Sequence, residues 1–148
     1  MAYEPLLKKT GIFSNMHTTI ITSNNGKIHT AECNNILEAL QLRGVEVEPV
    51  LCGNGDPWVA EREQWHSGAN FFSFDDNHII GYRRNQGTIT ALDKAGFAVL
   101  NAEDVAVGKV NPYDYRKAVV TFAASELPRG GGGARCMTCP INRNPIAE

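Results

Sequence analysis

The sequence carries almost no excess charge of either sign. Its 14 Lys and Arg side chains nearly balance 16 Asp and Glu side chains, which leaves a formal net charge of −2. Because phosphate backbones are bound through an excess of basic side chains, we expect no nucleic acid among the partners. Apolar residues make up 43% of the chain, so the composition does not fit a disordered protein either.

Long apolar runs are also missing, and cysteine is scarce. No run approaches the roughly 20 residues of a membrane helix, and charges interrupt the apolar stretch in MAYEPLLKKT at once. We therefore expect no membrane partner and no signal peptide. Four cysteines in 148 residues are too few for a disulfide scaffold. Free thiols in a reducing cytoplasm are the simpler reading.

An internal repeat appears at an offset of 52 residues. LEALQLRGVEVEPV (37–50) aligns with ITALDKAGFAVLNA (89–102), and the agreement continues upstream of both segments. Each copy reads as a hairpin, a helix, a glycine and a strand, so residues 17–51 and 69–101 are predicted to superpose as two ββαβ units. Any α/β protein repeats "helix, glycine, strand", but agreement on both sides of the helix favours a true repeat.

Local signals predict the individual elements. Apolar residues near helical spacing follow Asn34 and Asn35, which suit the start of a helix at Ile36. Val45 and Val47 alternate as in a strand. The turn sequences at 24–26 and 75–77 suit hairpins, residues 56–68 a short helix or ordered turn, and residues 118–123 a strand. Residues 103–117 are polar and are expected to form a surface excursion.

Four consecutive glycines, 130–133, stand out near the end of the sequence. Ordering such a run costs backbone entropy, so it indicates either a mobile linker or a loop whose backbone approaches a ligand. A linker normally joins two domains, yet only 15 residues follow Gly133. We therefore expect a functional loop spanning about residues 125–140.

Cys136 follows this loop directly. Bare backbone N–H groups and Arg135 both favour a thiolate, the nucleophilic form. As alternatives, Cys136 and Cys139 form a CxxC pair for redox work or for zinc, although a second close pair of ligands is lacking. On the nucleophile reading, Cys139 is expected to be a small buried residue. The histidines have no distinctive context and are expected to be surface or satisfied polar sites: His17, His29, His66 and His78.

Several stretches resemble the C-terminal part of arginine deiminase, in the order that the family has them. They are GNGDP (53–57), EREQWHSGANFF (61–72), GYRRNQGTITALDKAGFAVL (81–100) and the final SELPRGGGGARCMTCPINR. The resemblance implies an α/β fold of the pentein, or α/β-propeller, type, with five ββαβ modules around a pseudo-fivefold axis. The chain is expected to hold about two of these modules in one domain, residues 1–148.

The resemblance also implies a chemistry. A thiolate attacks the central carbon of a guanidinium, ammonia leaves, and water cleaves the covalent amidino-cysteine to give citrulline. On this basis Cys136 is the catalytic residue, and Gly130, Gly131 and Gly132 are expected to bind substrate. The substrate is arginine or a related guanidino compound, and the resemblance implies neither a cofactor nor a metal.

The chain departs from the family pattern in one important respect. The family's catalytic histidine lies in an H-x-D motif, and the nearest match here, His17-Thr18-Thr19, lacks the aspartate. Aligning EPLLKKTGIFS with the segment after that motif places the motif before Met1. We therefore expect a C-terminal portion that is inactive alone. Gly131 also stands where some members carry an arginine.

Two other functions remain open. The chain could be a degenerate, non-catalytic binding module, or a thiol-redox or metal protein that uses Cys136 and Cys139. Modules taken from a closed ring leave apolar flanks, which favour association. We therefore expect self-association at micromolar concentration, or pairing with a missing N-terminal half.

Overall fold

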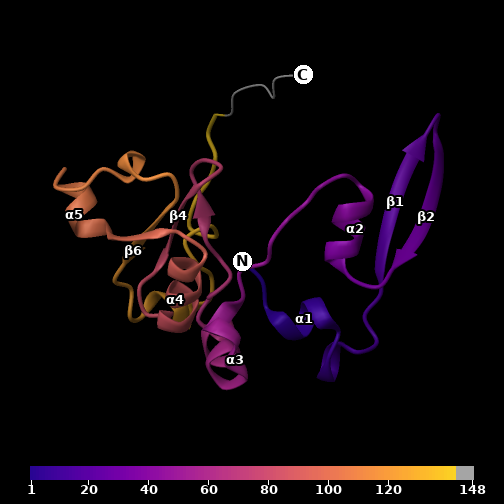
Figure 1. The fold of residues 1–148 in the computed structure, drawn as a ribbon, viewed down its shortest axis with the longest axis horizontal. Coiled ribbons are helices and arrows are strands. Elements are labelled where there is room, and N and C mark those ends of the chain that lie inside the picture. The colour runs from indigo at the N-terminus through magenta and orange to yellow at the C-terminus, as the bar shows by residue number, and fades with distance from the viewer. Residues whose placement is uncertain (143–148) are drawn as a thin grey trace.

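The computed structural model describes residues 1–142 and shows a mixed α/β chain with two small sheets (Figure 1). The α-helices are α1 (Glu4–Lys8), α2 (Ile36–Leu42), α3 (Pro57–Trp65), α4 (Gln86–Lys94) and α5 (Ala102–Ala106). The strands are β1 (Thr18–Asn24), β2 (Lys27–Cys33), β3 (Phe72–Ser73), β4 (His78–Tyr82), β5 (Ala98–Asn101) and β6 (Ala118–Phe122). Short 3-10 turns are η1 (Gly11–Phe13), η2 (Cys52–Gly55), η3 (Pro112–Asp114) and η4 (Leu127–Gly130). Among these described residues, no helix has the length and hydropathy to cross a bilayer.

The first sheet is the predicted hairpin of β1 and β2. The strands pair antiparallel from Thr18 opposite Cys33 to Asn24 opposite Lys27. Asn25 (φ 49°) and Gly26 (φ 76°) both adopt the positive φ that a tight two-residue hairpin turn requires. Helix α2 then begins as predicted, because the Asn35 side chain accepts a hydrogen bond from the Glu38 N–H at 3.0 Å.

The second sheet has the strand order β3-β4-β6-β5. Strands β4 and β5 both run parallel to β6, and the two-residue strand β3 pairs antiparallel with β4. The hairpin at 75–77 and the strand at 118–123 are thereby confirmed. Helix α4 packs on this sheet through Ile89 and Leu92, which meet Val119 in the hydrophobic core.

Burial is distributed very unevenly along the chain. Every buried residue lies at Cys52 or later, and none of residues 1–51 is buried. In Figure 1 the β1–β2 hairpin and α2 accordingly lie apart from the part that holds β4, β6 and α4. The core therefore supports the second sheet and its helices, while the hairpin is held by few contacts.

One strand prediction is wrong. No strand forms over residues 43–50, and Val45 and Val47 are 45% and 50% exposed. The segment aligned with it at the 52-residue offset contains β5, which is a strand because β6 pairs with it. Here the one contact of this kind is an isolated bridge between Leu51 and Ala2, so the backbone lacks a ladder to join. The correspondence of 17–51 with 69–101 stays a prediction.

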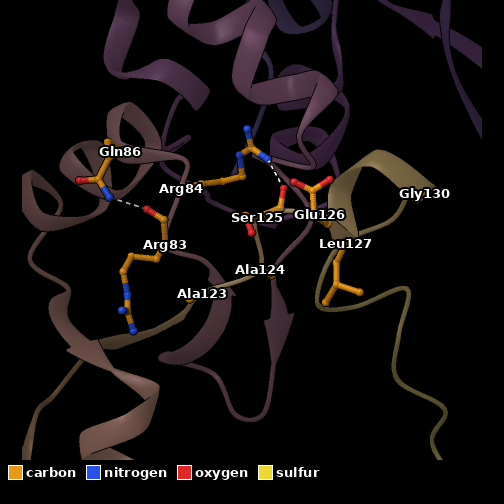
Figure 2. A pocket seen from close by; sticks show the side chains of 9 residues that line it. All are labelled: Arg83, Arg84, Gln86, Ala123, Ala124, Ser125, Glu126, Leu127 and Gly130. Carbon is orange, nitrogen blue, oxygen red and sulfur yellow. Dashed lines mark hydrogen bonds between the residues drawn. The ribbon is translucent and has the colours of Figure 1, made fainter.

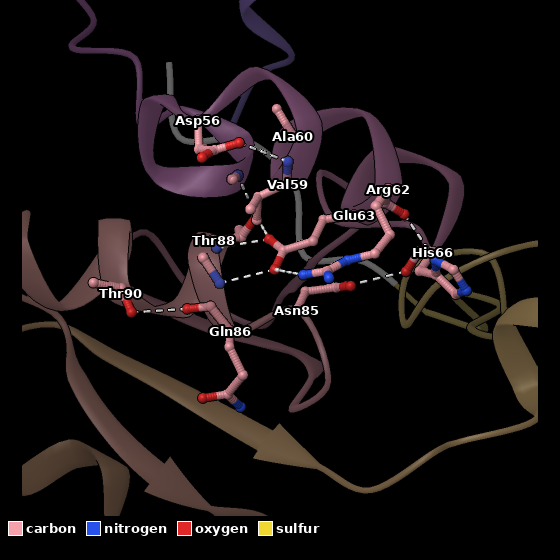
Figure 3. A network of polar contacts seen from close by, with 12 residues as sticks. Asp56, Val59, Ala60, Arg62, Glu63, His66, Asn85, Gln86, Thr88 and Thr90 are labelled. Carbon is pink, nitrogen blue, oxygen red and sulfur yellow. Dashed lines mark hydrogen bonds and ion pairs between the residues drawn. The ribbon is translucent and has the colours of Figure 1, made fainter.

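Helices α3 and α4 are joined by a buried carboxylate (Figure 3). Glu63 on α3 is 1% exposed and accepts hydrogen bonds from the Gly87 and Thr88 N–H groups, both at 2.8 Å. The Thr88 hydroxyl donates to the same carboxylate at 2.7 Å. The N-cap residue Asn85 makes no capping bond with its own side chain. Glu63 therefore caps α4 from a different helix.

The polar excursion at 103–117 is attached to the sheet through His78. This residue lies at the start of β4 and is 7% exposed. Its Nδ1 donates to the Asp75 carboxylate at 2.7 Å, and its Nε2 donates to the Tyr115 carbonyl at 3.0 Å. Both ring nitrogens face acceptors, so the geometry suits the protonated imidazolium. His78 is thus a satisfied polar site, one of the two environments expected for it.

Candidate active site

The glycine loop follows strand β6 and is fastened to the end of strand β4. Tyr82, 2% exposed, donates a hydrogen bond from its hydroxyl to the Gly132 carbonyl at 3.2 Å. Gly131 (φ 81°) and Gly132 (φ 91°) adopt backbone conformations that side chains rarely allow. The loop is therefore an ordered turn that ends at Cys136 and runs over the carboxyl end of a core strand.

Asn70 holds the other side of the loop. Its Nδ2 donates to Cys136 Sγ at 2.7 Å, and its Oδ1 accepts from the Arg135 N–H at 3.2 Å. The two halves of one amide thus contact the cysteine and the residue before it. Asn70 lies just before β3, 66 residues away along the chain from Cys136. The position of the thiol consequently depends on a contact between two distant segments.

These contacts favour ionisation of the candidate nucleophile. A hydrogen bond from the Gly133 backbone N–H, then the Asn70 amide, then the positive charge of Arg135 lower the pKa of the Cys136 thiol below its usual value. Cys136 is exposed to solvent. By contrast, burial raises the pKa of the Cys52 thiol. Cys136 therefore combines exposure to solvent with a lowered thiol pKa.

Gly133 is the loop position where a side chain has no room. A Cβ added there would lie 2.6 Å from the Asn70 carbonyl oxygen and 2.7 Å from its Cβ. A Cβ added at Gly130 would meet nothing within 4 Å. Because the Gly133 backbone lies so close to Asn70, the Gly133 N–H and the Asn70 amide both reach the Cys136 thiol.

An open pocket of ≈ 790 Å³ lies beside the loop (Figure 2). It is lined by Arg83, Arg84, Gln86, Ala123, Ala124, Ser125, Glu126, Leu127 and Gly130. Arg84 crosses it and donates from Nη1 to the Ser125 carbonyl at 2.8 Å. A smaller pocket of ≈ 360 Å³ lies against Arg135, Phe71 and Phe72. The two hollows flank the loop, and neither is lined by Cys136 itself.

The other candidate residues are placed less closely to the thiol. Cys139 is exposed, so its predicted burial is wrong, because the turn after Cys136 leaves the chain at the surface. Within residues 1–142 no hydrogen bond links a histidine to Cys136. His66 instead donates from Nδ1 to the Arg62 carbonyl at 2.7 Å. The described part of the chain also holds no group of three His, Cys, Asp or Glu side chains arranged for a metal ion.

Sequence reasoning missed Asn70 and Tyr82. Both lie in stretches that carry the family resemblance, at 61–72 and 81–100. Nothing in their local spacing marks either residue as a contact of the loop. Asn70 precedes an apolar run and Tyr82 ends one, as many other polar residues do. Only the sheet brings them to Gly132 and Cys136.

Comparison with known proteins identifies the family of the chain. The chain matches the arginine deiminase family over residues 2–143. It is 39% identical over 105 residues to an arginine deiminase of Mycoplasma capricolum subsp. capricolum, an alignment that covers 71% of this chain and 21% of that protein. It is 35% identical over 108 residues to an arginine deiminase of Mycobacterium marinum, with 73% and 22% covered. The chain spans about a fifth of the length of these curated relatives. It belongs to the arginine deiminase family.

Proposed function

We propose that this chain supplies the nucleophilic cysteine of an amidinohydrolase that converts arginine and water into citrulline and ammonia. The observation that carries the proposal is the hydrogen bonding of Cys136: the Asn70 amide donates to Sγ at 2.7 Å, and the Gly133 N–H lowers the thiol pKa. The family supplies the guanidino substrate class. The pentein fold, with about two of its five modules in this chain, belongs to the same proposal.

The reaction takes two steps at one sulfur. The Cys136 thiolate adds to the central guanidinium carbon, a terminal C–N bond breaks, and the nitrogen leaves as ammonia after taking up a proton. Water then adds to the same carbon of the amidino-cysteine, the C–S bond breaks, and the thiolate is regenerated as a urea forms. Each step needs a group that gives or takes a proton beside the sulfur.

The described residues do not place such a proton-transferring group at Cys136. No histidine or carboxylate within residues 1–142 makes a hydrogen bond to its sulfur. Members of a catalytic unit act together, and losing one already removes most of the rate. We therefore propose that the chain alone does not turn over arginine, and that a histidine and guanidinium-binding carboxylates must come from another polypeptide segment.

Partial alkylation tests the nucleophile. Protein treated with a limiting amount of iodoacetamide should carry its first label on Cys136, as located by mass spectrometry of peptides. A first label on Cys33 or Cys139 would contradict an activated Cys136. Cys52 is buried and serves as an internal reference for an unreactive thiol.

A citrulline assay tests the reaction. The chain alone should form no measurable citrulline, whereas addition of the N-terminal part of a similar arginine deiminase should give activity that Cys136→Ser abolishes. Citrulline from the chain alone, lost in Cys136→Ser, would show that this polypeptide carries its own base. Failure of every combination to form citrulline would contradict the proposed reaction.

A thiol-redox function is the second candidate, favoured by one observation. Cys136 and Cys139 are both exposed and unpaired, and the pKa of Cys136 is lowered. If these cysteines cycle as a redox pair, mild oxidation should join them in one intramolecular disulfide that thioredoxin reduces. Formation of sulfenic acid on Cys136 without that disulfide would speak against this function.

A further inference from the structure

Helix α3 presents two tryptophans to solvent on one stripe. Trp58 is 83% exposed and Trp65 is 79% exposed, and seven residues, or two helical turns, separate them. The opposite side of α3 carries Ala60 and Glu63, which are buried against the rest of the molecule. In Figure 1 the helix lies at the edge of the fold. Exposed aromatic side chains of this kind mark protein interaction surfaces.

Two opposite charges lie between the tryptophans on the same stripe. Glu61 and Arg62 are both exposed, and Glu61 makes no side-chain hydrogen bond among the described residues. Arg62 Nη2 makes a long ion pair with Glu63 Oε1, at 3.9 Å, and the Arg62 side chain remains 65% exposed (Figure 3). Along the helix the stripe therefore reads tryptophan, acid, base, tryptophan. When a second copy of this stripe runs antiparallel to the first, each acid faces a base and each tryptophan faces a tryptophan.

We propose that this stripe, Trp58, Glu61, Arg62 and Trp65, binds the same stripe of a second copy of the chain, with the two α3 helices antiparallel about a twofold axis. Such an axis passing between residues 61 and 62 places Trp58 against Trp65 of the second copy. It also places Glu61 against Arg62 in both directions. A parallel arrangement would oppose like charges, so charge complementarity selects the antiparallel one.

The area available fits a dimer of modest affinity. A tryptophan buries roughly 150–250 Å², so four of them supply about half of the 1,200–2,000 Å² that a specific interface needs. The exposed flanks of the helix would supply the rest. Tryptophan and arginine are also the residues that dominate binding energy at interface centres. We expect dissociation in the micromolar range.

Charge reversal tests the arrangement directly. Sedimentation velocity across micromolar concentrations should show a dimer for the wild type and monomers for Glu61→Arg and for Arg62→Glu, each checked for folding by circular dichroism. An equimolar mixture of these two variants should form a heterodimer, because every pair across the axis is then opposite in charge. The double variant Glu61→Arg/Arg62→Glu should dimerise again.

Two further variants keep the test independent of the charge changes. Trp65→Ser should weaken dimerisation at least tenfold, whereas Val107→Ser, at a 77% exposed position directly after α5, should leave it unchanged. A wild type that stays monomeric throughout would overturn the proposal. A dimer that survives Glu61→Arg and Trp65→Ser, or two folded single variants that do not pair when mixed, would overturn it as well.

Discussion

At the scale of single residues, one amide decides how Cys136 is presented. Asn70 contacts both the sulfur and the backbone of the preceding residue, and Gly133 leaves room for it to do so. Neighbouring charge adds to this effect, since Arg135 also favours the thiolate. The reactivity of the thiol should therefore respond to changes at Asn70 and at Gly133.

Replacing Asn70 should slow the reaction of Cys136. Asn70→Ala removes a donor to the thiolate, so the thiol pKa should rise and alkylation at pH 7 should slow several-fold. The measurement is the alkylation rate of Cys136 against pH, followed by peptide mass spectrometry. The rate profile of Cys139 is the internal control and should not move. An unchanged Cys136 profile would show that the amide does not stabilise the thiolate.

Adding a methyl group at Gly133 should have a related effect by a steric route. Gly133→Ala must push the loop away from Asn70, since its Cβ would lie 2.6 Å from a backbone oxygen. We expect that Cys136 is then no longer the first cysteine labelled by a limiting amount of iodoacetamide. The protein should also lose about 1–3 kcal/mol of unfolding free energy. Gly130→Ala, with open space at its Cβ, is the matched control. Equal behaviour of the two variants would contradict this account.

At the scale of elements, two polar side chains join segments that the sequence separates. Glu63 connects α3 to the N-terminus of α4, and His78 connects the β3–β4 turn to the excursion at 103–117. Glu63 accepts the capping hydrogen bonds that the Asn85 side chain does not, and His78 donates to a carbonyl 37 residues away along the chain. Changes at either site should alter the free energy of unfolding, and the effect at His78 should depend on pH.

Removal of the Glu63 carboxylate should destabilise the fold strongly. Glu63→Ala leaves the buried Thr88 N–H and the partly buried Gly87 N–H without their acceptor and removes the closer acceptor of the Thr88 hydroxyl. The loss should cost about 2–4 kcal/mol of unfolding free energy. Urea denaturation measures it. Asp93→Ala, an exposed position on α4, is the control and should change stability little. A loss below about 1 kcal/mol would mean that water satisfies these donors.

The pair of His78 and Asp75 should make stability depend on pH. The Asp75 hydrogen bond raises the pKa of His78, so its stabilising effect is complete below the unfolded histidine value and is lost as pH rises through the folded one. The Asn77 N–H, and then His78, lower the pKa of Asp75, so this contribution is lost as pH falls through its folded value. The groups facing His78 are Asp75, the Tyr115 and Pro112 carbonyls and the Tyr113 and Phe74 rings.

The expected result is a fall in the urea midpoint as pH rises from about 6.5 to 8. In His78→Gln this alkaline slope should be absent, and the midpoint at pH 6 should lie below that of the wild type. His29→Gln, at an exposed strand position, is the control and should keep the slope. Parallel curves for wild type and His78→Gln would refute the assignment.

At the scale of the whole molecule, the chain has one well-supported part and one that is hardly buried. All buried side chains lie from Cys52 onward, whereas the β1–β2 hairpin exposes Ile21 and Ile28 at 70% and 72%. An isolated two-stranded hairpin is marginally stable in water. Residues 1–51 should therefore open far more readily than the second sheet.

Hydrogen exchange should resolve this difference. Amides of β1 and β2 should exchange at least about a hundredfold faster than those of β4 and β6, because local opening there exposes no core. The measurement is peptide-level exchange followed by mass spectrometry at low protein concentration. Similar protection in both sheets would show that the hairpin is covered in solution, by a second copy or by another polypeptide.

The sequence by itself determined the local features and the family. Asn35 starts α2, the Asn25-Gly26 pair makes the hairpin turn, and the glycine run followed by Cys136 identifies the candidate nucleophile. These are short-range effects: capping, positive φ and backbone freedom act within a few residues. They can be read without knowing which segments meet.

Only the tertiary structure decided which distant groups act together. Asn70 reaches Cys136 across 66 residues, and Glu63 caps a helix 25 residues away. The segment at Val45 and Val47 has the alternation of a strand but forms none, because a strand needs a neighbour to complete its hydrogen bonds. The alternation of apolar and polar side chains shows only that a segment is suited to a sheet, whereas the presence of a partner strand is a property of the fold.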